Sequence, residues 1–456
     1  MAKAAQIYRC AECGWSTGKW VGRCGECQSW GSVEEAGRPR GVALASAPVS
    51  QPARPIAAVD LEAARSRPTG VGELDRALGG GLVQGAVILL AGEPGVGKST
   101  LLLEVAARWA TTAGRALYVT GEESAAQVRL RAERTESLAD GLFLAAETDL
   151  AAVLGHVEQV QPSLLVLDSV QTVSRADTDG APGGVSQIRE VAAALIRVAK
   201  DRGMATILVG HVTKDGSIAG PRVLEHLVDV VLQFEGERHS RLRMVRSVKN
   251  RYGPSDEVGC FDISDSGISS MTDPTGLFLS RHTDAAPGTC VTVTLEGRRP
   301  LLAEVQALVA VSSLGTPRRA TSGLDSSRVA MVLAVLERRG GLNLRSSDVY
   351  AATVGGARLV EPAGDLALMV AVASGAHDLP VPPGLVAIGE VGLAGEIRRV
   401  TGIQRRLAEA ERMGFTRALV PPDPGPVPAG IDVVEISDVV SALGAARCPV
   451  PALPHG

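Results

Sequence analysis

The feature that most constrains the fold is the segment "AVILLAGEPGVGKSTLLLEVAARWA" at residues 86–110. It begins with a short apolar run typical of a buried strand, continues with the glycine-rich pattern G-x-x-x-x-G-K-[ST], and ends with apolar residues at helical spacing. In this order the glycines let backbone N–H groups turn toward phosphate oxygens, and the helix N-terminus adds its dipole. The pattern therefore predicts a phosphate-binding loop.

The residues expected to contact a nucleotide are Gly92, Glu93, Pro94, Gly95, Val96, Gly97, Lys98, Ser99 and Thr100. In loops of this kind the lysine reaches the β- and γ-phosphates, and the hydroxyl that follows it binds Mg²⁺. We expect Lys98 and Ser99 to have these two roles, with ATP as the nucleotide.

Further short apolar runs follow the loop, separated by helical stretches. With the loop's own strand they are "AVILLAG" (86–92), "RALYVTG" (115–121), "SLLVLDS" (163–169), "ATILVGH" (205–211) and "VVLQFEG" (230–236). Consecutive apolar positions are typical of strands buried on both faces, as in a parallel sheet covered by helices. We therefore predict an α/β domain over residues 67–272.

Two carboxylates are candidates for the hydrolytic chemistry. Asp168 ends the run "SLLVLDS", where P-loop ATPases place the carboxylate that holds Mg²⁺, although an aspartate there can also cap the next element. Hydrolysis further needs a group that orients or deprotonates the attacking water. "YVTGEES" offers Glu122 and Glu123; we assign the base to Glu122 and a structural role to Glu123.

The N-terminus carries "CAEC" and "CGEC", separated by ten residues. Two C-x-x-C knuckles place four thiolates around one point, so Cys10, Cys13, Cys24 and Cys27 are expected to bind a structural Zn²⁺ ion. The alternative is a set of buried or redox-active thiols. Three tryptophans, Trp15, Trp20 and Trp30, are expected to form the small core of this unit, with base stacking as their other possible role.

Changes in amino-acid composition divide the rest of the chain into further regions. Residues 1–33 are expected to form the zinc unit, 34–66 a linker rich in alanine and proline, and 273–456 a second α/β domain. In the second domain we expect strands at 289–297 and 300–309, a polar loop at 312–325 and a helix at 326–340. The net charge of −4 provides no global attraction to nucleic acid, and the lack of a long apolar run or apolar leader predicts a cytoplasmic protein without membrane contact.

The stretch "TGVGELDRALGGGLVQGAVILLAGEPGVGKST" resembles the RecA-type recombinases and ring helicases. Together with the four-cysteine unit, "KNRYG" and "PLLAEVQALV", it resembles the RadA (Sms) family of bacterial DNA-repair proteins over nearly the whole chain. The resemblance implies a RecA-like ATPase core and assembly into a homo-oligomer of six subunits.

The resemblance gives a role to "KNRYG" at residues 249–253. It implies that Lys249 and Arg251, called the basic fork below, complete the ATP site of the adjacent subunit, where a finger in trans is worth roughly 10³–10⁵ in rate. The alternative is a solvated turn with two surface cations. The family usually has phenylalanine where this chain has Tyr252, a change that keeps the ring.

Two loops occupy the positions at which RecA-like proteins contact single-stranded DNA. One follows Asp168 and carries Arg175 and Arg189; the other follows the strand at 205–211 and carries Lys214 and Arg222. Cations in a channel bind a DNA backbone without a basic overall charge. His211 either senses the γ-phosphate or is a packing residue.

The C-terminal domain resembles the proteolytic domain of Lon proteases, which use a serine–lysine dyad. Ala363 stands where the serine would be, in "EPAGD", and Gln404 where the lysine would be. Neither side chain supplies an activatable nucleophile or base, so we expect no peptidase activity. The domain is expected to assemble the ring and to offer DNA a basic surface.

Taken together, the sequence predicts a DNA-dependent ATPase of recombinational repair. It is expected to act as a ring-shaped motor on single-stranded DNA and branched recombination intermediates, with a recombinase as partner, and to promote branch migration. Two other hypotheses remain: a zinc-bearing DNA-binding scaffold locked by ATP, and a KaiC-like signalling ATPase. Stimulation by single-stranded DNA would favour the motor, and autophosphorylation would favour the signalling ATPase.

Overall fold

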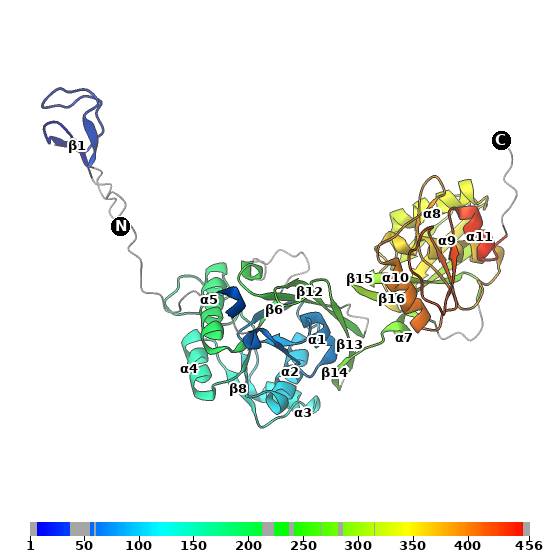
Figure 1. Cartoon of the computed structure of the whole chain (residues 1–456), viewed down its shortest axis with the longest axis horizontal. Helices are drawn as coiled ribbons and strands as arrows, with labels where there is room; N and C mark the ends of the chain where they lie inside the picture. The colour runs from blue at the N-terminus through cyan, green and yellow to red at the C-terminus, as the bar shows by residue number, and fades with distance from the viewer. Residues whose placement is uncertain are drawn as a thin grey trace. The chain divides into compact units, whose positions relative to one another are not determined.

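The computed structural model describes residues 7–36, 55–58, 61–211, 223–236, 241–264, 266–280, 286–313 and 315–449. The chain divides into two compact units, Met1–Asp60 and Leu61–Gly456, each described by itself. Helices, strands and their labels are shown in Figure 1. The mixed α/β class predicted from the sequence is confirmed. The finer boundaries near residues 34, 67 and 273 stay predictions.

The N-terminal unit is a small antiparallel sheet. Its strands are β1 (Ile7–Cys10), β2 (Ser16–Thr17) and β3 (Val33–Ala36), in the order β2-β1-β3. Trp15 packs against the core of this unit as expected. The expectation is wrong for Trp20 and Trp30, whose relative exposures are 66% and 78%. A unit this small has too little interior to bury three indole rings, because surface dominates at this size.

The second unit begins with a nine-stranded sheet in the order β14-β13-β12-β11-β6-β10-β9-β7-β8. The strands are β6 (Val87–Gly92), β7 (Ala116–Thr120), β8 (Leu142–Ala146), β9 (Leu164–Asp168), β10 (Ala205–His211), β11 (Val230–Glu235), β12 (Leu242–Asn250), β13 (Val258–Ser264) and β14 (Gly267–Ser270). The strands from β11 to β8 are parallel, and β12 to β14 are antiparallel. The five predicted strands are confirmed, and the antiparallel extension was not predicted.

Helices cover both faces of this sheet, as the apolar runs predicted. They are α1 (Gly72–Leu78), α2 (Lys98–Thr112), α3 (Ala125–Arg134), α4 (Leu150–Val160) and α5 (Val185–Arg202), with the short strands β4 (Ser66–Arg67) and β5 (Leu82–Val83) beside them. In β6, Ile88 and Leu90 join the core formed with α1, α2 and α3. Val87, Leu89 and Ala91 join the core formed with α4 and α5. The period of two in a strand sends alternate residues to opposite faces.

The C-terminal region contains a seven-stranded sheet in the order β17-β18-β16-β15-β19-β22-β23. Its strands are β15 (Thr289–Glu296), β16 (Arg299–Val311), β17 (Arg319–Ser322), β18 (Ser347–Thr353), β19 (Leu385–Ala387), β22 (Arg417–Val420) and β23 (Asp432–Glu435), with the two-stranded sheet β20 (Glu390–Val391) and β21 (Ile397–Arg398). The helices are α7 (Thr275–Phe278), α8 (Ser326–Arg339), α9 (Asp365–His377), α10 (Ile403–Arg412) and α11 (Val439–Ala445). The expectation of an unbroken polar loop at 312–325 is wrong, because β17 forms there and pairs with β18.

A hairpin tip of the C-terminal region contacts the ATPase sheet. Between β15 and β16, the backbone N–H of Arg298 donates to the carbonyl of Asp256 at 2.8 Å, and Arg299 is buried against Glu73 of α1. Gly297 has φ +60°, and a Cβ there would lie 2.0 Å from the carbonyl oxygen of Asp256, so a side chain does not fit. The chain turns tightly at this contact for that reason.

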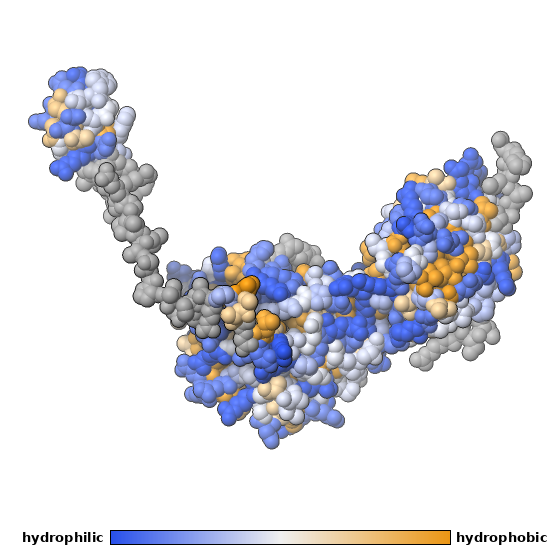
Figure 2. Space-filling model, viewed as in Figure 1, coloured by the Kyte–Doolittle hydropathy of each residue, from blue (hydrophilic) through white to orange (hydrophobic). Residues whose placement is uncertain are grey.

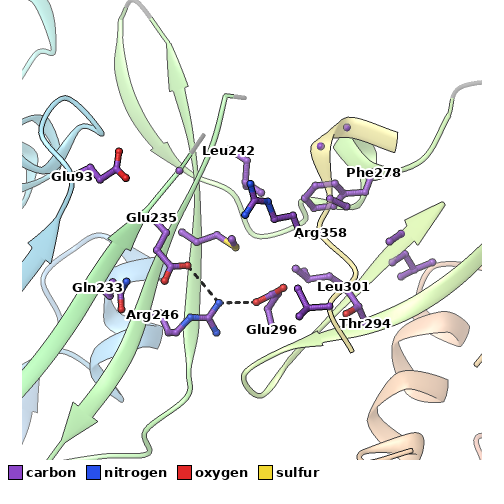
Figure 3. Close-up of a pocket in the computed structure, with 18 residues that line it drawn as sticks. Glu93, Gln233, Glu235, Leu242, Arg246, Phe278, Thr294, Glu296, Leu301 and Arg358 are labelled. Atoms are coloured by element: carbon purple, nitrogen blue, oxygen red, sulfur yellow. Dashed lines mark hydrogen bonds and ion pairs between the residues drawn. The ribbon is translucent and has the colours of Figure 1, made fainter. Parts of the chain in front are cut away.

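A cavity of about 530 Å³ lies beside this hairpin. Figure 3 shows Arg246 of β12 between Glu235 of β11 and Glu296 of β15. The Arg246–Glu296 ion pair measures 2.7 Å. Glu93 of the phosphate-binding loop also lines the cavity. The contact thus lies next to the nucleotide loop.

The surface of the described residues mixes hydrophilic and apolar side chains (Figure 2). Among the described residues, the exposed large apolar side chains of the C-terminal region include Leu308, Val311, Val360 and Leu393. Within the same residues, the helices are too short or too polar to span a bilayer.

Candidate nucleotide-binding site

The phosphate-binding loop connects β6 to α2, and its conformation depends on glycine. Gly95 and Gly97 have φ values of +79° and +110°, which side chains other than that of glycine rarely adopt. Lys98 begins α2 and is only 3% exposed. Its ammonium group donates to the carbonyls of Gly92 at 2.9 Å and Glu93 at 2.8 Å. The lysine therefore lies within the curve of the loop.

Acidic residues face this lysine. Burial lowers the pKa of Lys98 to about 8, although the charges of Asp168, Glu122 and Glu93 oppose that change. An anionic ligand in the loop would add an opposite charge and favour the protonated amine. The predicted loop residues and both predicted carboxylates are thus brought to one edge of the sheet.

Asp168 ends β9 and is 7% exposed. The hydroxyl of Tyr118, on the neighbouring strand β7, donates to it at 2.6 Å. Burial, and then the charge of Asp168, raise the pKa of Tyr118 well above its ordinary value, so the phenol remains a donor. Sequence reasoning missed Tyr118; a phenol within the apolar run "ALYVT" is the signal that could have indicated it.

Glu122 follows β7 and is held by residues from two neighbouring strands. Its Oε1 accepts a hydrogen bond from Ser169 Oγ at 2.7 Å and lies 3.0 Å from Nε2 of His211. Its side chain is 44% exposed. Glu123 differs: its carboxylate is paired with Arg131 of α3, and its backbone N–H donates to Thr120 at 3.0 Å.

Buried polar atoms without a partner also lie beside Glu122. Among the described residues, neither Nδ1 of His211 nor Oε1 of Gln171 has a hydrogen-bond partner. Gln171 lies next to His211, since its amide donates to the His211 carbonyl at 3.4 Å. Buried polar groups are normally satisfied, so these two atoms mark a polar region beside Glu122 whose hydrogen-bonding capacity is not used within the described residues.

The residues around the loop fit Mg²⁺. A buried carboxylate, that of Asp168, and the hydroxyl of Ser99 at the start of α2 are oxygen donors, which hard cations prefer. This donor set is therefore compatible with the ion that accompanies ATP, and the roles of Asp168 and Ser99 stay predictions.

The basic fork lies at the opposite end of the same sheet. Lys249 pairs with Val231 and Asn250 with Val230, which in turn pairs with Ile88 at the start of β6. The phosphate-binding loop follows Gly92 at the other end of β6. At about 3.3 Å per residue, Ile88 and Gly92 are on the order of 13 Å apart along β6. The structure therefore does not bring the fork to the loop of its own chain.

Within the chain the fork is held by its own neighbours. The Lys249 ammonium donates to the carbonyls of Glu225 at 2.7 Å and Val228 at 2.8 Å. Arg251 forms an ion pair with Asp229 at 3.2 Å. Burial, and then the charge of Arg251, lower the pKa of Lys249.

The residues predicted to contact DNA are only partly described. Arg175 pairs with Asp177 at 2.5 Å and lies 3.8 Å from Glu190, so local acids compete for this cation. Arg189 is exposed on α5. Lys214 and Arg222 lie outside the described residues.

The four cysteines of the N-terminal unit converge as predicted. Their sulfur atoms all lie within 4.8 Å of one another, with Cys10 and Cys27 at 3.7 Å and Cys13 and Cys24 at 3.5 Å. A tetrahedron with Zn–S bonds near 2.3 Å requires sulfur separations of about 3.8 Å, so the cluster fits zinc. A hydrogen-bond contact with Ser32 lowers the pKa of Cys10 to about 6, which favours the thiolate that metals bind.

In the C-terminal region, the two residues predicted to replace a protease dyad make structural contacts. Ala363 is 1% exposed in the short helix Pro362–Gly364. The amide of Gln404 donates to the carbonyl of Pro424 at 2.7 Å. Near them Arg406 is fully buried and forms a two-pronged ion pair with Glu361.

The fold and this site define a P-loop ATPase joined to a zinc ribbon. Comparison with known families agrees: residues 52–217 match the family described as AAA domain, and residues 8–35 match the rubredoxin metal binding domain. These matches support ATP hydrolysis and zinc binding.

Similar proteins identify the family. The chain is 56% identical to the DNA repair protein RadA of Mycolicibacterium smegmatis, with 98% of each chain covered. It is 56% identical to that of Mycobacterium tuberculosis strain H37Rv (97% of this chain, 93% of the relative) and 47% identical to that of Pseudomonas aeruginosa (98% and 99%). The chain belongs to the RadA family of DNA repair proteins, which confirms the family predicted from the sequence.

Proposed function

We propose that the protein is a DNA-stimulated ATPase that works as a ring of six identical subunits and drives branch migration of recombination intermediates. The observation that carries the proposal is the separation of two parts of one catalytic site. The phosphate-binding loop and Glu122 lie at one end of β6, and the fork lies at the other. A second subunit can supply the fork that the first cannot reach.

In this proposal each group of the loop end has one task. Lys98 binds the β- and γ-phosphates of ATP, and Asp168 with Ser99 holds Mg²⁺, which neutralises phosphate charge when bound. Glu122 accepts a proton from the attacking water while a bond forms from that water to the γ-phosphorus and the bond to ADP breaks. The free oxygen of Glu122 supports this task, because both described contacts of the carboxylate use Oε1.

The fork stabilises the charge of the transferring phosphoryl group across the subunit boundary. Lys249 and Arg251 are held by two carbonyls and by Asp229, and we assign the active position to the assembled ring. Single-stranded DNA in the channel would bind through Arg175, Arg189, Lys214 and Arg222, and a recombinase would present the branched substrate.

A mixing experiment tests the split site. Lys249→Ala lacks the fork and Glu122→Gln lacks the base, so each variant by itself is expected to lose about 10²-fold or more in ATP turnover. Rings mixed from both variants contain boundaries where an intact base meets an intact fork, and turnover should return there. ATP binding, measured with a fluorescent analogue, should be retained by both variants. The proposal fails if no mixing ratio restores turnover.

The same assay separates the motor from the other hypotheses. Single-stranded DNA should raise the turnover of a motor and leave that of an ATP-locked scaffold unchanged. A phosphorylated protein chain after incubation with labelled ATP would instead support a signalling ATPase.

A further inference from the structure

A buried carboxylate beside the fork collects several contacts. Asp229 is 5% exposed and accepts a hydrogen bond from the backbone N–H of Val87, where β6 begins, at 3.0 Å. It forms ion pairs with Lys200 at 2.6 Å and Arg251 at 3.2 Å. One carboxylate thus joins the fork to the last turns of α5.

A second contact joins the same lysine to the fork segment. The Lys200 ammonium lies 3.3 Å from the hydroxyl of Tyr252. A phenylalanine at this position would have no hydroxyl and could not make this contact. Tyr252 therefore provides a polar contact between α5 and the fork segment.

The other end of α5 holds the glycine-rich loop that follows Asp168. Gln187, 2% exposed in the first turn of α5, accepts a hydrogen bond from the N–H of Arg175 at 2.9 Å. Its amide donates to the carbonyls of Thr178 at 2.6 Å and Arg175 at 3.2 Å. The loop is therefore fastened to the helix by a buried side chain.

Between these ends, α5 is packed as one rigid body. Its inward side chains are at most 1% exposed; they are Ile188, Val191, Ala192, Leu195 and Ala199. From Gln187 to Lys200 the helix extends about 20 Å at 1.5 Å per residue. A close-packed helix transmits a shift of one end to the other, since interiors have low compressibility.

We propose that α5 couples the glycine-rich loop to the basic fork, with Gln187 at one end and Lys200 and Asp229 at the other as positioning residues. The inference rests on the proposed function and adds its regulation. Single-stranded DNA bound to the loop moves α5 and thereby changes the contacts of Lys200 with Asp229 and Tyr252. These changes alter the position that Arg251 takes toward the neighbouring subunit. The two arrangements of the fork are Arg251 held by Asp229 and Arg251 released from it.

The test measures the stimulation ratio, which is kcat with saturating poly(dT) divided by kcat without it, on the full-length protein. Lys200→Met should lower this ratio by about fivefold or more, the usual range for coupled sites. Tyr252→Phe should lower it less, by about twofold, because a neutral hydrogen bond is weaker than one between charges. Lys200→Arg keeps the positive charge and should therefore keep much of the wild-type ratio.

Arg202→Met is the matched control. It removes one exposed cation of the same helix, whose ion-pair partner is Glu158 rather than Asp229, so its ratio should equal that of the wild type. The Kd for poly(dT) and the KM for ATP are measured for every variant. A structural role of Lys200 would change melting temperature or KM, whereas coupling changes the ratio.

A double-mutant cycle examines the path through the helix. If Gln187→Ala and Lys200→Met act on one coupling, the double variant should have the ratio of the more affected single variant. Strictly multiplicative effects, or a wild-type ratio in Lys200→Met, would overturn the inference. A loss of ratio explained by an equal loss of poly(dT) binding would overturn it too.

Failure of the underlying function gives a different result. If poly(dT) does not stimulate the wild-type enzyme, or mixed rings never regain turnover, the proposed motor falls. If the wild type is stimulated and mixed rings recover, but Lys200→Met behaves as the wild type, only the coupling through α5 falls.

Discussion

Two glutamates, one in each half of the second unit, are held in place in different ways. Both contacts of Glu122 go to one oxygen, Oε1, and the side chain is 44% exposed. Glu361 in the C-terminal region uses both oxygens: Arg406 binds Oε1 at 2.6 Å and Oε2 at 2.7 Å. Thr294 and the N–H of Leu295 donate to the same Oε1 at 2.9 and 2.7 Å.

The difference lies in what remains available for chemistry. Among the described residues, Oε2 of Glu122 has no hydrogen-bond partner, so this carboxylate can accept a proton from water. Both oxygens of Glu361 accept hydrogen bonds from the protein, and its partner Arg406 is fully buried. Both glutamates lie beside cations or polar groups. The number of carboxylate oxygens that accept hydrogen bonds distinguishes the candidate base, Glu122, from the structural ion pair of Glu361.

The largest expected effect is at the open carboxylate. Glu122→Gln keeps the shape and the contacts to Ser169 and His211 but removes the base, so kcat should fall by about 10²–10⁴-fold. ATP binding and the melting temperature should stay close to wild-type values. Steady-state ATP hydrolysis with poly(dT) measures the change, and a fall of less than about threefold would remove Glu122 from the role.

The corresponding change at the closed carboxylate should affect stability instead. Arg406→Met leaves Glu361 without its counter-ion, and breaking such a pair costs about 3–5 kcal/mol. Denaturant unfolding followed by fluorescence measures it. Turnover per folded protein should remain near that of the wild type. Lost turnover with unchanged stability would break the comparison, since it would give the C-terminal pair a catalytic task.

The double variant Arg406→Met/Glu361→Gln is the control for that prediction. Removing both charges leaves no unpaired ion, so it should be less destabilised than Arg406→Met alone. Equal losses would mean that Arg406 acts through packing of its side chain rather than through charge.

Acid should act on the same pair at a smaller scale. Burial alone would raise the pKa of Glu361, but Arg406, with Leu295 N–H and Thr294, brings it below the ordinary value of 4.5. A carboxyl with a lowered folded-state pKa contributes its stability in full above pH 4.5 and loses it as the pH falls through the folded value. The unfolding free energy should therefore drop below pH 4.5 more in the wild type than in the double variant. Parallel curves would contradict this.

The sequence allowed the ATPase fold to be predicted because its strands are buried on both faces and its loop has a fixed spacing. "AVILLAG" and "SLLVLDS" had no alternative to a covered parallel sheet. The strand β17 at Arg319–Ser322 could not be predicted, since it is short, polar and at a sheet edge, where pairing with β18 alone decides. The exposure of Trp20 and Trp30 likewise depends on the size of the folded unit.

For the site, motif spacing indicated the loop, Asp168 and the cysteines, but not contacts between distant strands. Ser169 follows β9 and His211 ends β10. These residues reach Glu122 only because β10, β9 and β7 are consecutive strands of the folded sheet. The ion pair of Lys200 with Asp229 joins residues 29 apart in the chain. Neither pairing leaves a local pattern, so each had to come from the structure.

The smallest predicted effect concerns His211, which the sequence left open between phosphate sensing and packing. His211 contacts Oε1 of Glu122, whereas the proposed reaction uses Oε2 to accept the proton of the attacking water. Loss of one hydrogen bond to a charged group should lower kcat by about tenfold in His211→Asn. Ser169→Ala removes the other contact to the same oxygen and is its matched partner. If both residues only orient Glu122, the two variants should keep the wild-type KM for ATP and a normal stimulation ratio. Their combined effect on kcat should then be less than the product of the single effects, because both residues position the same carboxylate. If His211 instead senses the γ-phosphate through its unpartnered Nδ1, His211→Asn alone should raise KM for ATP or lower the response to poly(dT), while Ser169→Ala should not.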